Sequence, residues 1–315
     1  MHRQRISYRS LLPPALVAFA AMLWGTDGIW RTSLIQTMPA TTIVFWEHVI
    51  LVAVTGWLLW RERGQLARLD AGDWVAALVI GIGASGLATV LFTAAFTLAS
   101  PTTVLLLQKT QPLIAISLAA VMLREPLPGR FWTLLPFALL GAYFIMVGDT
   151  GPLAFLSQTG GSPAGALMTL LAAALWGAGT VLGRRLLVKL EFPTLTALRF
   201  ATALPALTVI AFAFGFGGAP GPAQIGPLLA TALLAGLAGL MLYYRGLRDT
   251  PAAVATLCEL CFPITAVLLN VFLLGVPLNL NQVLGIALLW GALALMQHRS
   301  VPAGETVGEA VPATS

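Results

Sequence analysis

Charged side chains are scarce in this sequence. Asp, Glu, Lys and Arg make up 9% of the 315 residues, whereas a soluble globular domain carries roughly 25%. Hydrophobic residues account for 58%, which is more apolar surface than a soluble fold of this length can hide behind so few charges. The composition therefore excludes an ordinary soluble domain and favours a protein embedded in lipid.

Cysteine is also rare, and motifs of catalysis are missing. The two cysteines, Cys258 and Cys261, fall in one apolar run, so no disulfide framework is predicted. Their CxxC spacing has no second ligand pair, which argues against a zinc site. The sequence contains no phosphate-binding loop, metal-ligand cluster or catalytic triad. We therefore expect no enzyme, no ATP-driven pump, no bound metal and no cofactor.

Long apolar runs, in contrast, recur along the whole chain. A transmembrane helix needs about 20 mostly apolar residues, and the sequence predicts an all-α integral membrane protein with ten such helices. The predicted spans are Leu12–Leu34, Thr41–Trp60, Trp74–Leu98, Thr102–Leu123, Phe131–Val147, Gly165–Leu187, Thr194–Phe216, Ile225–Leu247, Ala252–Leu274 and Leu278–Gln297. The small, polar tail 299–315 is expected to be disordered and cytoplasmic.

The basic residues predict an orientation for these spans. The net charge of +5 is not gathered on one face or arm, which argues against a nucleic-acid partner. Most of the 17 Lys and Arg residues lie in alternate loops, which is typical of the cytoplasmic side: Arg3, Arg5, Arg9, Arg61, Arg63, Arg68, Arg124, Arg130, Arg184, Arg185, Lys189, Arg245, Arg248 and Arg299. We therefore expect a multi-pass protein of the inner membrane with both termini in the cytoplasm.

The two halves of the chain resemble each other. The motif Leu23-Trp24-Gly25 recurs as Leu175-Trp176-Gly177, and the spacing from Gln108 to Pro112 recurs from Glu259 to Pro263. Pro126-Leu127 and Pro277-Leu278 follow those prolines at one common interval. Matches of several residues at one offset indicate an internal repeat. Because five spans are an odd number, the second copy enters the membrane from the other side, which predicts two inverted five-helix repeats at 12–147 and 165–297.

Inverted repeats are the characteristic architecture of secondary transporters, in which the substrate site lies near the midplane between the halves. Channels and a few membrane enzymes are also duplicated, so a channel and a lipid-modifying enzyme stand as alternatives. An enzyme would need a nucleophile or metal constellation at the interface, and the sequence shows none.

The repeated segments resemble the drug/metabolite transporter superfamily, in its ten-helix EamA-type branch. The resemblance rests on Leu-Trp-Gly in each half, on Gln108-Lys109-Thr110-Gln111-Pro112 leading to Leu123-Arg124-Glu125-Pro126-Leu127, and on Phe262-Pro263 leading to Leu274-Gly275-Val276-Pro277-Leu278. That family usually has Gly-Glu before the final span of each half; here the second half has Gly275-Val276 and lacks the acid. The resemblance implies export or exchange of amino acids, metabolites or drugs, and it implies no particular substrate.

Ionisable side chains at membrane depth are candidate site residues, because each costs at least about 2.5–3.5 kcal/mol to insert at a helix centre. Together with two neighbouring amides, the predicted substrate-binding or coupling residues are Asp27, Glu47, Gln108, Lys109, Gln111, Arg199 and Glu259. Asp27 and Arg31 are four residues apart and are expected to pair. Glu47 and Arg199 have a second interpretation, in which each reaches toward an interface.

Prolines and small residues complete the predicted site. Proline removes the hydrogen bond to the carbonyl four residues earlier, so Pro112 and Pro263 are predicted hinges that free the carbonyls of Gln108 and Glu259; a simple packing kink is the alternative. Helix packing or cavity lining is predicted for Trp24, Gly25, Trp176, Gly177, Gly86 and Gly236. Tyr243 and Tyr244 are expected in an interfacial aromatic belt.

The sequence therefore predicts a secondary active transporter of a small molecule, such as an amino acid, metabolite or drug, that works by alternating access and is expected to be an exporter. An exchanger or an importer of the same fold is the alternative, and a channel is less favoured. Proton coupling through Glu47 and Glu259 is a hypothesis, and we expect a monomer or homodimer in the lipid bilayer.

Overall fold

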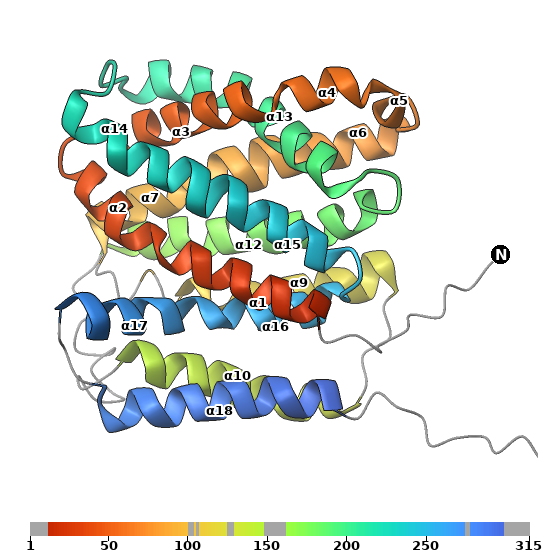
Figure 1. Cartoon of the computed structure of the whole chain (residues 1–315), viewed down its shortest axis with the longest axis vertical. Helices are drawn as coiled ribbons and strands as arrows, with labels where there is room; N and C mark the ends of the chain where they lie inside the picture. Colours follow the sequence, from red (N-terminus) through yellow and green to blue (C-terminus); the bar gives the residue numbers. More distant parts are fainter. Residues whose placement is uncertain are drawn as a thin grey trace, which may run out of the picture.

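A computed structural model of the chain describes residues 12–99, 104, 107–124, 129–147, 162–274 and 278–298, and its regular structure there is helical (Figure 1). Six helices are long and apolar enough to cross a membrane: Leu12–Ile35, Ala40–Arg61, Ala71–Leu98, Pro163–Leu186, Phe192–Phe214 and Pro222–Leu247. Shorter apolar helices cover Gln111–Leu123, Gly129–Ile145, Ala252–Thr265 and Leu280–Leu295. The prediction of an all-α membrane fold is confirmed, whereas Pro126, Pro277 and the tail 299–315 lie outside the described residues.

Several spans consist of more than one helical segment. The first half contains α1 (Leu12–Gly25), α2 (Asp27–Ile35), α3 (Ala40–Thr55), α4 (Trp57–Arg61), α5 (Arg63–Leu66), α6 (Ala71–Leu78), η1 (Val79–Leu87), α7 (Ala88–Leu98), α9 (Gln111–Leu118), η2 (Ala119–Leu123) and α10 (Gly129–Val147). The second half contains α12 (Pro163–Leu186), α13 (Phe192–Phe214), α14 (Pro222–Leu229), η4 (Ala230–Ala238), α15 (Gly239–Leu247), α16 (Ala252–Cys258), η5 (Glu259–Cys261), α17 (Phe262–Leu274) and α18 (Leu280–His298).

The last helices of the two halves, α10 and α18, lie side by side at the bottom of Figure 1. They cross at a glycine from each helix: a Cβ added to Gly141 would lie 2.8 Å from the Gly285 carbonyl oxygen, and one added to Gly285 would lie 2.7 Å from that of Gly141. Small residues let helix backbones approach closely in a bilayer, where lipid tails already satisfy apolar side chains. This crossing therefore joins the two halves backbone to backbone.

The third span of each half contains a wider, π-helical segment at a matching place. Segments η1 (Val79–Leu87) and η4 (Ala230–Ala238) both have nine residues, and the interval between them equals that between Gln108 and Glu259. A π-helical segment widens the turn and is frequent at functional sites. Two such segments at one offset in the chain are a structural counterpart of the sequence repeat.

An ion-pair latch joins the two halves at one end of the bundle; we use this name for Asp70, Asp73, Arg185 and Lys189. Asp70 caps α6 by accepting from the Asp73 backbone N–H at 2.9 Å. Lys189, which follows α12, contacts Asp73 and lies 2.9 Å from Asp70 Oδ2, and Arg185 lies 3.2 Å from Asp73 Oδ1. The Asp73 side chain is 2% exposed. We call this end, on the right in Figure 1, the latch end.

The opposite end carries a neutral contact where the latch has charges. Gln224 stands in the second half where Asp73 stands in the first, and Thr37 corresponds in the same way to Lys189. Gln224 Nε2 donates to Thr37 Oγ1 at 3.0 Å, and its Oε1 accepts from the Gly221 backbone N–H at 2.7 Å. The repeat thus places corresponding contacts between the halves at the two ends, ionic for the latch and uncharged for Gln224 and Thr37.

The latch also shifts titrations outside the membrane-spanning segments. The hydrogen bond from Lys189 and the Asp73 backbone N–H lower the pKa of Asp70 from 3.8 to about 2, and the two aspartates raise the pKa of Lys189. A depressed carboxyl pKa gives stability that is complete above the unfolded pKa and is lost as pH falls through the folded one. The Asp70 contribution is therefore present above about pH 4 and is lost toward pH 2.

Removing the Asp73 carboxylate, which both bases of the latch share, tests how much the latch contributes to stability. Arg185 and Lys189 are 45% and 39% exposed, so they regain water in an Asp73→Ala variant. We therefore expect a loss of about 1–2 kcal/mol of unfolding free energy, below the about 3–5 kcal/mol of a fully buried pair. Thermal unfolding in detergent measures the loss. Gln224→Ala is the matched control and should cost under about 1 kcal/mol; equal losses in both variants would contradict an electrostatic role.

Candidate functional site

A cavity of about 330 Å³ lies between the two halves, and helices of both contribute its walls. Most of the predicted site residues line it: Trp24, Gly25, Asp27, Glu47, Gln108, Lys109, Gln111, Trp176, Arg199, Gly236 and Glu259. Among the predicted residues, Gly86, Pro112, Gly177 and Pro263 are not part of the lining. The volume is at the lower end of the about 300–1,000 Å³ that small-molecule sites have.

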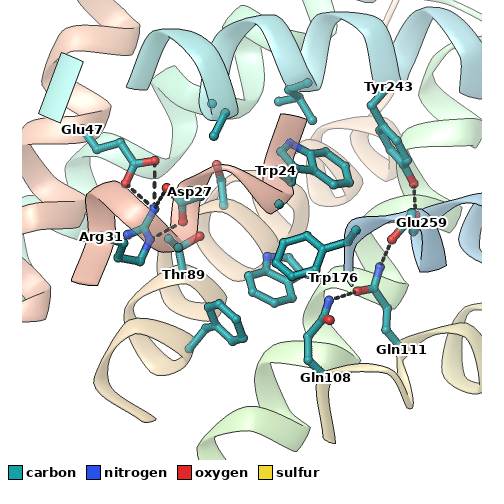
Figure 2. A pocket seen from close by; sticks show the side chains of 18 of the residues that line it. Trp24, Asp27, Arg31, Glu47, Thr89, Gln108, Gln111, Trp176, Tyr243 and Glu259 are labelled. Atoms are coloured by element: carbon teal, nitrogen blue, oxygen red, sulfur yellow. Dashed lines mark hydrogen bonds and ion pairs between the residues drawn. The ribbon is translucent and has the colours of Figure 1, made fainter. Parts of the chain in front are cut away.

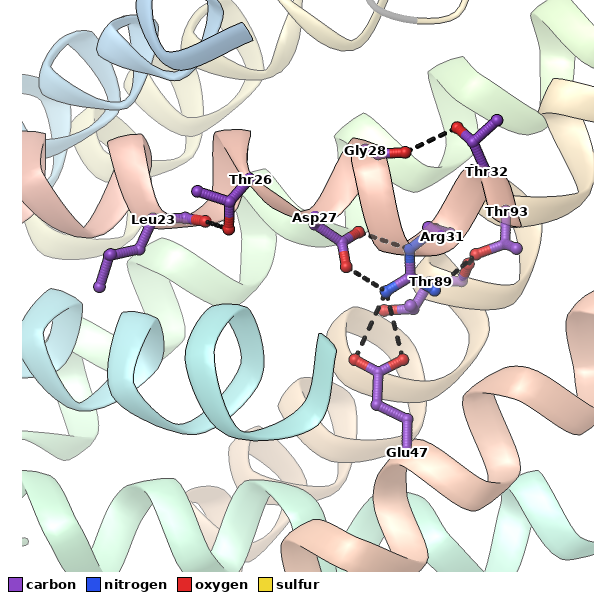
Figure 3. Close-up of polar contacts among 9 residues, drawn as sticks. All are labelled: Leu23, Thr26, Asp27, Gly28, Arg31, Thr32, Glu47, Thr89 and Thr93. Atoms are coloured by element: carbon purple, nitrogen blue, oxygen red, sulfur yellow. Dashed lines mark hydrogen bonds and ion pairs between the residues drawn. The ribbon is translucent and has the colours of Figure 1, made fainter. Parts of the chain in front are cut away.

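Arg31 holds two carboxylates in the wall of this cavity (Figure 3). The first span breaks at Thr26, and α2 places Asp27 and Arg31 on one face. Arg31 Nε lies 2.5 Å from Asp27 Oδ2, as their spacing predicts, and Nη2 lies 3.2 Å from Glu47 Oε2 on α3. Arg31 Nη1 also donates to Thr93 Oγ1 at 3.2 Å. Glu47, which is 6% exposed, thus stays inside the bundle, and the interfacial interpretation of this residue is wrong.

A chain of hydrogen bonds forms the second polar cluster (Figure 2). Gln108 Nε2 donates to Gln111 Oε1 at 3.0 Å, and Gln111 Nε2 donates to Glu259 Oε2 at 2.5 Å. The Tyr243 hydroxyl donates to Glu259 Oε1 at 2.7 Å and lies 2.7 Å from Thr180 Oγ1. Because the carboxylate accepts, Gln111 points its amide N–H toward Glu259, and its free amide oxygen then accepts from Gln108. Glu259 thus sets the orientation of Gln111 directly and of Gln108 through Gln111.

Aromatic rings occupy matching positions in the two halves. The Trp24 and Tyr243 ring centroids are 5.0 Å apart, and those of Trp176 and Phe92 are also 5.0 Å apart. Trp176 repeats Trp24, and Tyr243 follows Phe92 at the interval that separates Glu259 from Gln108. Each pair joins one half to the other. In Figure 2 Trp24 and Trp176 lie in the middle of the view, with the Arg31 cluster on one side and the Glu259 cluster on the other.

The fourth and ninth spans break beside the cavity, one turn before their prolines. The chain turns at Lys109 and Thr110 before α9 begins, and η5 forms a 3₁₀ turn at Glu259–Cys261 before α17 begins. Pro112 and Pro263 are each the second residue of the helix that follows. A proline in the first helical turn lacks an N–H that has no intrahelical partner anyway. The prolines therefore start the second helical segment, which differs from the alternative of a simple kink in a continuous helix; the predicted role as hinges stays a prediction.

Glycines of the repeated Leu-Trp-Gly motif pack against these breaks. A Cβ on Gly25 would lie 2.6 Å from the Phe262 carbonyl oxygen, and one on Gly177 would lie 3.3 Å from that of Gln111. The first helix of each half thus approaches the broken helix of the other half. Gly236 faces Leu51 and Gly86 faces Leu207 at ordinary packing distances of 3.4 Å.

The remaining buried bases differ in their partners. Arg199 donates from Nη1 to the Tyr244 hydroxyl at 3.0 Å and from Nη2 to the Ala84 carbonyl at 3.1 Å, so it remains inside the bundle. His48 contacts the Val44 carbonyl at 2.9 Å and Ser85 Oγ at 3.0 Å. Lys109 is 8% exposed, and its ammonium lies 4.3 Å from the centroid of the Phe262 ring.

Sequence reasoning missed part of the site. Tyr243 and Tyr244 are 3% and 0% exposed, so their expected place in an interfacial belt is wrong. The signal was present, since Tyr243 occupies the position that repeats Phe92 and faces the acid at Glu259. Arg31 was expected to pair with Asp27, and nothing in the linear spacing indicates that it also reaches Glu47 on the next span.

Arg31 is expected to be the electrostatic centre of its cluster. Arg31→Met leaves the buried Glu47 and the half-buried Asp27 without a counter-charge, so we expect a loss of about 3–5 kcal/mol in unfolding free energy. Glu47→Gln keeps a hydrogen-bonding side chain and removes the excess negative charge, so it should cost under about 2 kcal/mol. The double variant should recover part of the Arg31→Met loss. Thermal unfolding in detergent compares the three; Arg31→Met as stable as Glu47→Gln would contradict this view.

The chain matches the EamA-like transporter family twice, over residues 12–147 and 163–297. It is 34% identical over 279 residues to the riboflavin transporter ImpX of Fusobacterium nucleatum, which covers 85% of this chain and 91% of that protein. It is 27% identical over 299 residues to the uncharacterized transporter YwfM of Bacillus subtilis, with 93% and 96% covered. A crystal structure of another protein matches with a TM-score of 0.72 at 20% identity over 90% of this chain and 95% of that one, which supports the fold alone.

Two family matches of nearly equal length cover the two halves, so the duplication predicted from the motifs is confirmed. The relatives that are named for a role are transporters, and the chain spans most of each. The protein is therefore a multi-pass membrane transporter and not an enzyme, and it belongs to the EamA-like transporter family.

Proposed function

We propose that the protein is a secondary active transporter of a planar heteroaromatic metabolite, with riboflavin or a close analogue as the substrate. The observation that carries this proposal is the pairing of aromatic rings from both halves in one cavity, Trp24 with Tyr243 and Trp176 with Phe92. Aromatic faces bind flat rings by offset or edge-to-face contacts. The relative ImpX is a riboflavin transporter, which supports a ligand of this shape.

The charges of the cavity support a substrate without a net charge. Three acids line it, Asp27, Glu47 and Glu259, and they are balanced by three bases, Arg31, Lys109 and Arg199. An ionic substrate would leave this buried set unbalanced, at a high cost in a low dielectric. Riboflavin brings a flat tricyclic ring and a polar tail and leaves the balance unchanged.

Alternating access would work between the ion-pair latch and the opposite end. The lining continues along α2 past Gly28 to the exposed Thr32, so the cavity reaches the surface away from the latch. Toward the latch end, the buried Tyr244 and Leu247 close the bundle. Opening the latch end requires separating α6 from α12, which the latch holds together. The structure thus supports a state that is accessible from the end opposite the latch.

The predicted orientation places the latch end in the cytoplasm, because the basic loops lie there. Export remains the predicted direction, and uptake or exchange is the alternative, because a carrier that alternates access works in both directions. Proton coupling is supported by the Arg31 cluster, in which two carboxylates share one guanidinium and leave one negative charge that a proton can neutralise. Monomer or homodimer stays a prediction.

Riboflavin binding is the direct test. Quenching of riboflavin fluorescence by the purified protein should titrate to one site, and Trp24→Ala and Trp176→Ala should each weaken binding up to about tenfold, from the loss of about 0.5–1.5 kcal/mol of ring contact. Trp132→Ala is the matched control, because Trp132 on α10 is 56% exposed and outside the cavity. In proteoliposomes, internal riboflavin should stimulate entry of labelled riboflavin; uptake without this stimulation would indicate a channel.

The two native cysteines report access from the latch end. Cys258 and Cys261 are 1% and 3% exposed in the apolar core, outside the cavity lining, on the span that begins at Ala252. In an Asp73→Asn, Lys189→Gln variant, we expect an impermeant maleimide to label them faster in inside-out vesicles, because the state open at the latch end gains population. Thr37→Ala with Gln224→Ala should not accelerate it. Faster labelling from right-side-out cells instead would contradict the orientation, and unchanged labelling would contradict the gate.

A further inference from the structure

Lys109 is a buried cation that makes no direct ion pair with any residue that the structure describes. Among the residues that the structure describes, no carboxylate oxygen lies within 4.0 Å of its ammonium and no hydrogen bond reaches it. The side chain is 8% exposed and lines the cavity. Its contact is the face of the Phe262 ring, 4.3 Å away. A cation–π contact gives about 0.5–2 kcal/mol, which is less than a hydrogen-bonded acceptor gives a buried charge.

The other charged residues of the cavity have partners. Arg31 contacts Asp27 and Glu47, and Arg199 donates to a tyrosine hydroxyl and a backbone carbonyl. Glu259 accepts from Tyr243 and Gln111 through its two oxygens, so it does not neutralise Lys109 by direct contact. Lys109 is therefore a cavity cation whose ammonium donors all lack a described partner, whereas Arg199 uses two of its nitrogens and leaves only its Nε unpaired.

The repeat shows that the fold does not need a lysine at this place. The second half has Leu260 at the matching position, where it is 1% exposed in the apolar core. A leucine occupies the corresponding break in the ninth span. Packing alone therefore does not require a charged residue at the break in the fourth span. A buried ammonium in one half, opposite a leucine in the other, fits recognition of a ligand that is itself asymmetric.

We propose that Lys109 donates a hydrogen bond to a ring carbonyl of the substrate, so that the site selects planar heteroaromatic rings with a dione edge. This assignment rests on the proposed function. The paired aromatic rings contact the faces of the ligand. Lys109, at the turn before α9, donates to the carbonyl oxygens at the edge of the ligand ring. A neutral carbonyl oxygen accepts a charge-assisted hydrogen bond, and it keeps the three acids and three bases of the cavity in balance. In the absence of ligand, the cation–π contact with the Phe262 ring stabilises the Lys109 ammonium.

Four probes separate the ring edge from the rest of the ligand. Riboflavin and lumichrome carry the same dione edge, and lumichrome lacks the sugar-like tail. Phenazine has a flat tricyclic ring without the two carbonyls, and riboflavin 5′-phosphate adds an anionic group to the tail. Binding of each is measured by fluorescence or by competition, in wild type and in Lys109→Met, Lys109→Arg and Leu260→Met. The last variant is the matched control at the repeated position.

We expect Lys109→Met to weaken riboflavin and lumichrome by about ten- to a hundredfold, the effect of losing a hydrogen bond to a charged donor. Phenazine should change by less than about threefold, Lys109→Arg should recover part of the affinity, and Leu260→Met should leave the ratios between probes unchanged. If Lys109→Met fails to fold, the test is the ratio of affinities in the wild-type protein. Wild type should then bind lumichrome at least about tenfold more tightly than phenazine.

Three results would overturn the assignment. Riboflavin binding that is unchanged in Lys109→Met would remove the contact, and an equal loss for phenazine would show a structural role. A loss confined to riboflavin 5′-phosphate would show that the lysine binds an anion on the tail. These results differ from failure of the proposed function, in which wild type binds neither riboflavin nor lumichrome.

Discussion

Lipid offers no hydrogen-bond partners, and this constraint determines where the chain can depart from regular helix. An unpaired backbone group in the bilayer core costs several kcal/mol, so irregular backbone occurs only where protein or a polar cavity surrounds it. The turn at Lys109 and Thr110 and the 3₁₀ turn at Glu259–Cys261 meet that condition. Both lie beside the cavity, and each is covered by the first helix of the other half through Gly25 or Gly177.

Because the chain is duplicated, a broken helix beside the cavity occurs in each half, and the two copies differ in other respects. The π-helical segments, the broken spans and the paired rings occur at matching positions in both halves. The charges do not. Asp73 matches Gln224, Lys189 matches Thr37, and Lys109 matches Leu260. The shared features build a symmetric cavity, whereas the differences give its two ends unlike contacts and place a lysine in its wall on one side only.

The sequence predicted the fold and most of the cavity lining because both follow from one-dimensional regularities. Apolar length defines the spans, and the repeated motifs pair Trp24 with Trp176 and Gln108 with Glu259 at intervals that differ by one residue. It did not predict that Arg31 bridges Asp27 and Glu47, since that contact depends on how α2 tilts against α3. Tyr243 was misplaced because its neighbour Arg245 resembles an interfacial anchor, whereas the residue faces inward to Glu259.

The latch gives a rough scale for the transport cycle. Only Asp73 of the latch is buried, and its basic partners are about two-fifths exposed, so pairing at Asp73 contributes on the order of 1–2 kcal/mol. In the proposed transport cycle, that contribution would correspond to a roughly tenfold preference for the state closed at the latch end, since about 1.4 kcal/mol is tenfold in an equilibrium. The substrate proposed to bind between rings of both halves would then need only a comparable difference in affinity between the two states to reverse this preference. A modest, partly hydrated latch therefore suits a carrier better than a fully buried ion pair, which a ligand of this size would not open.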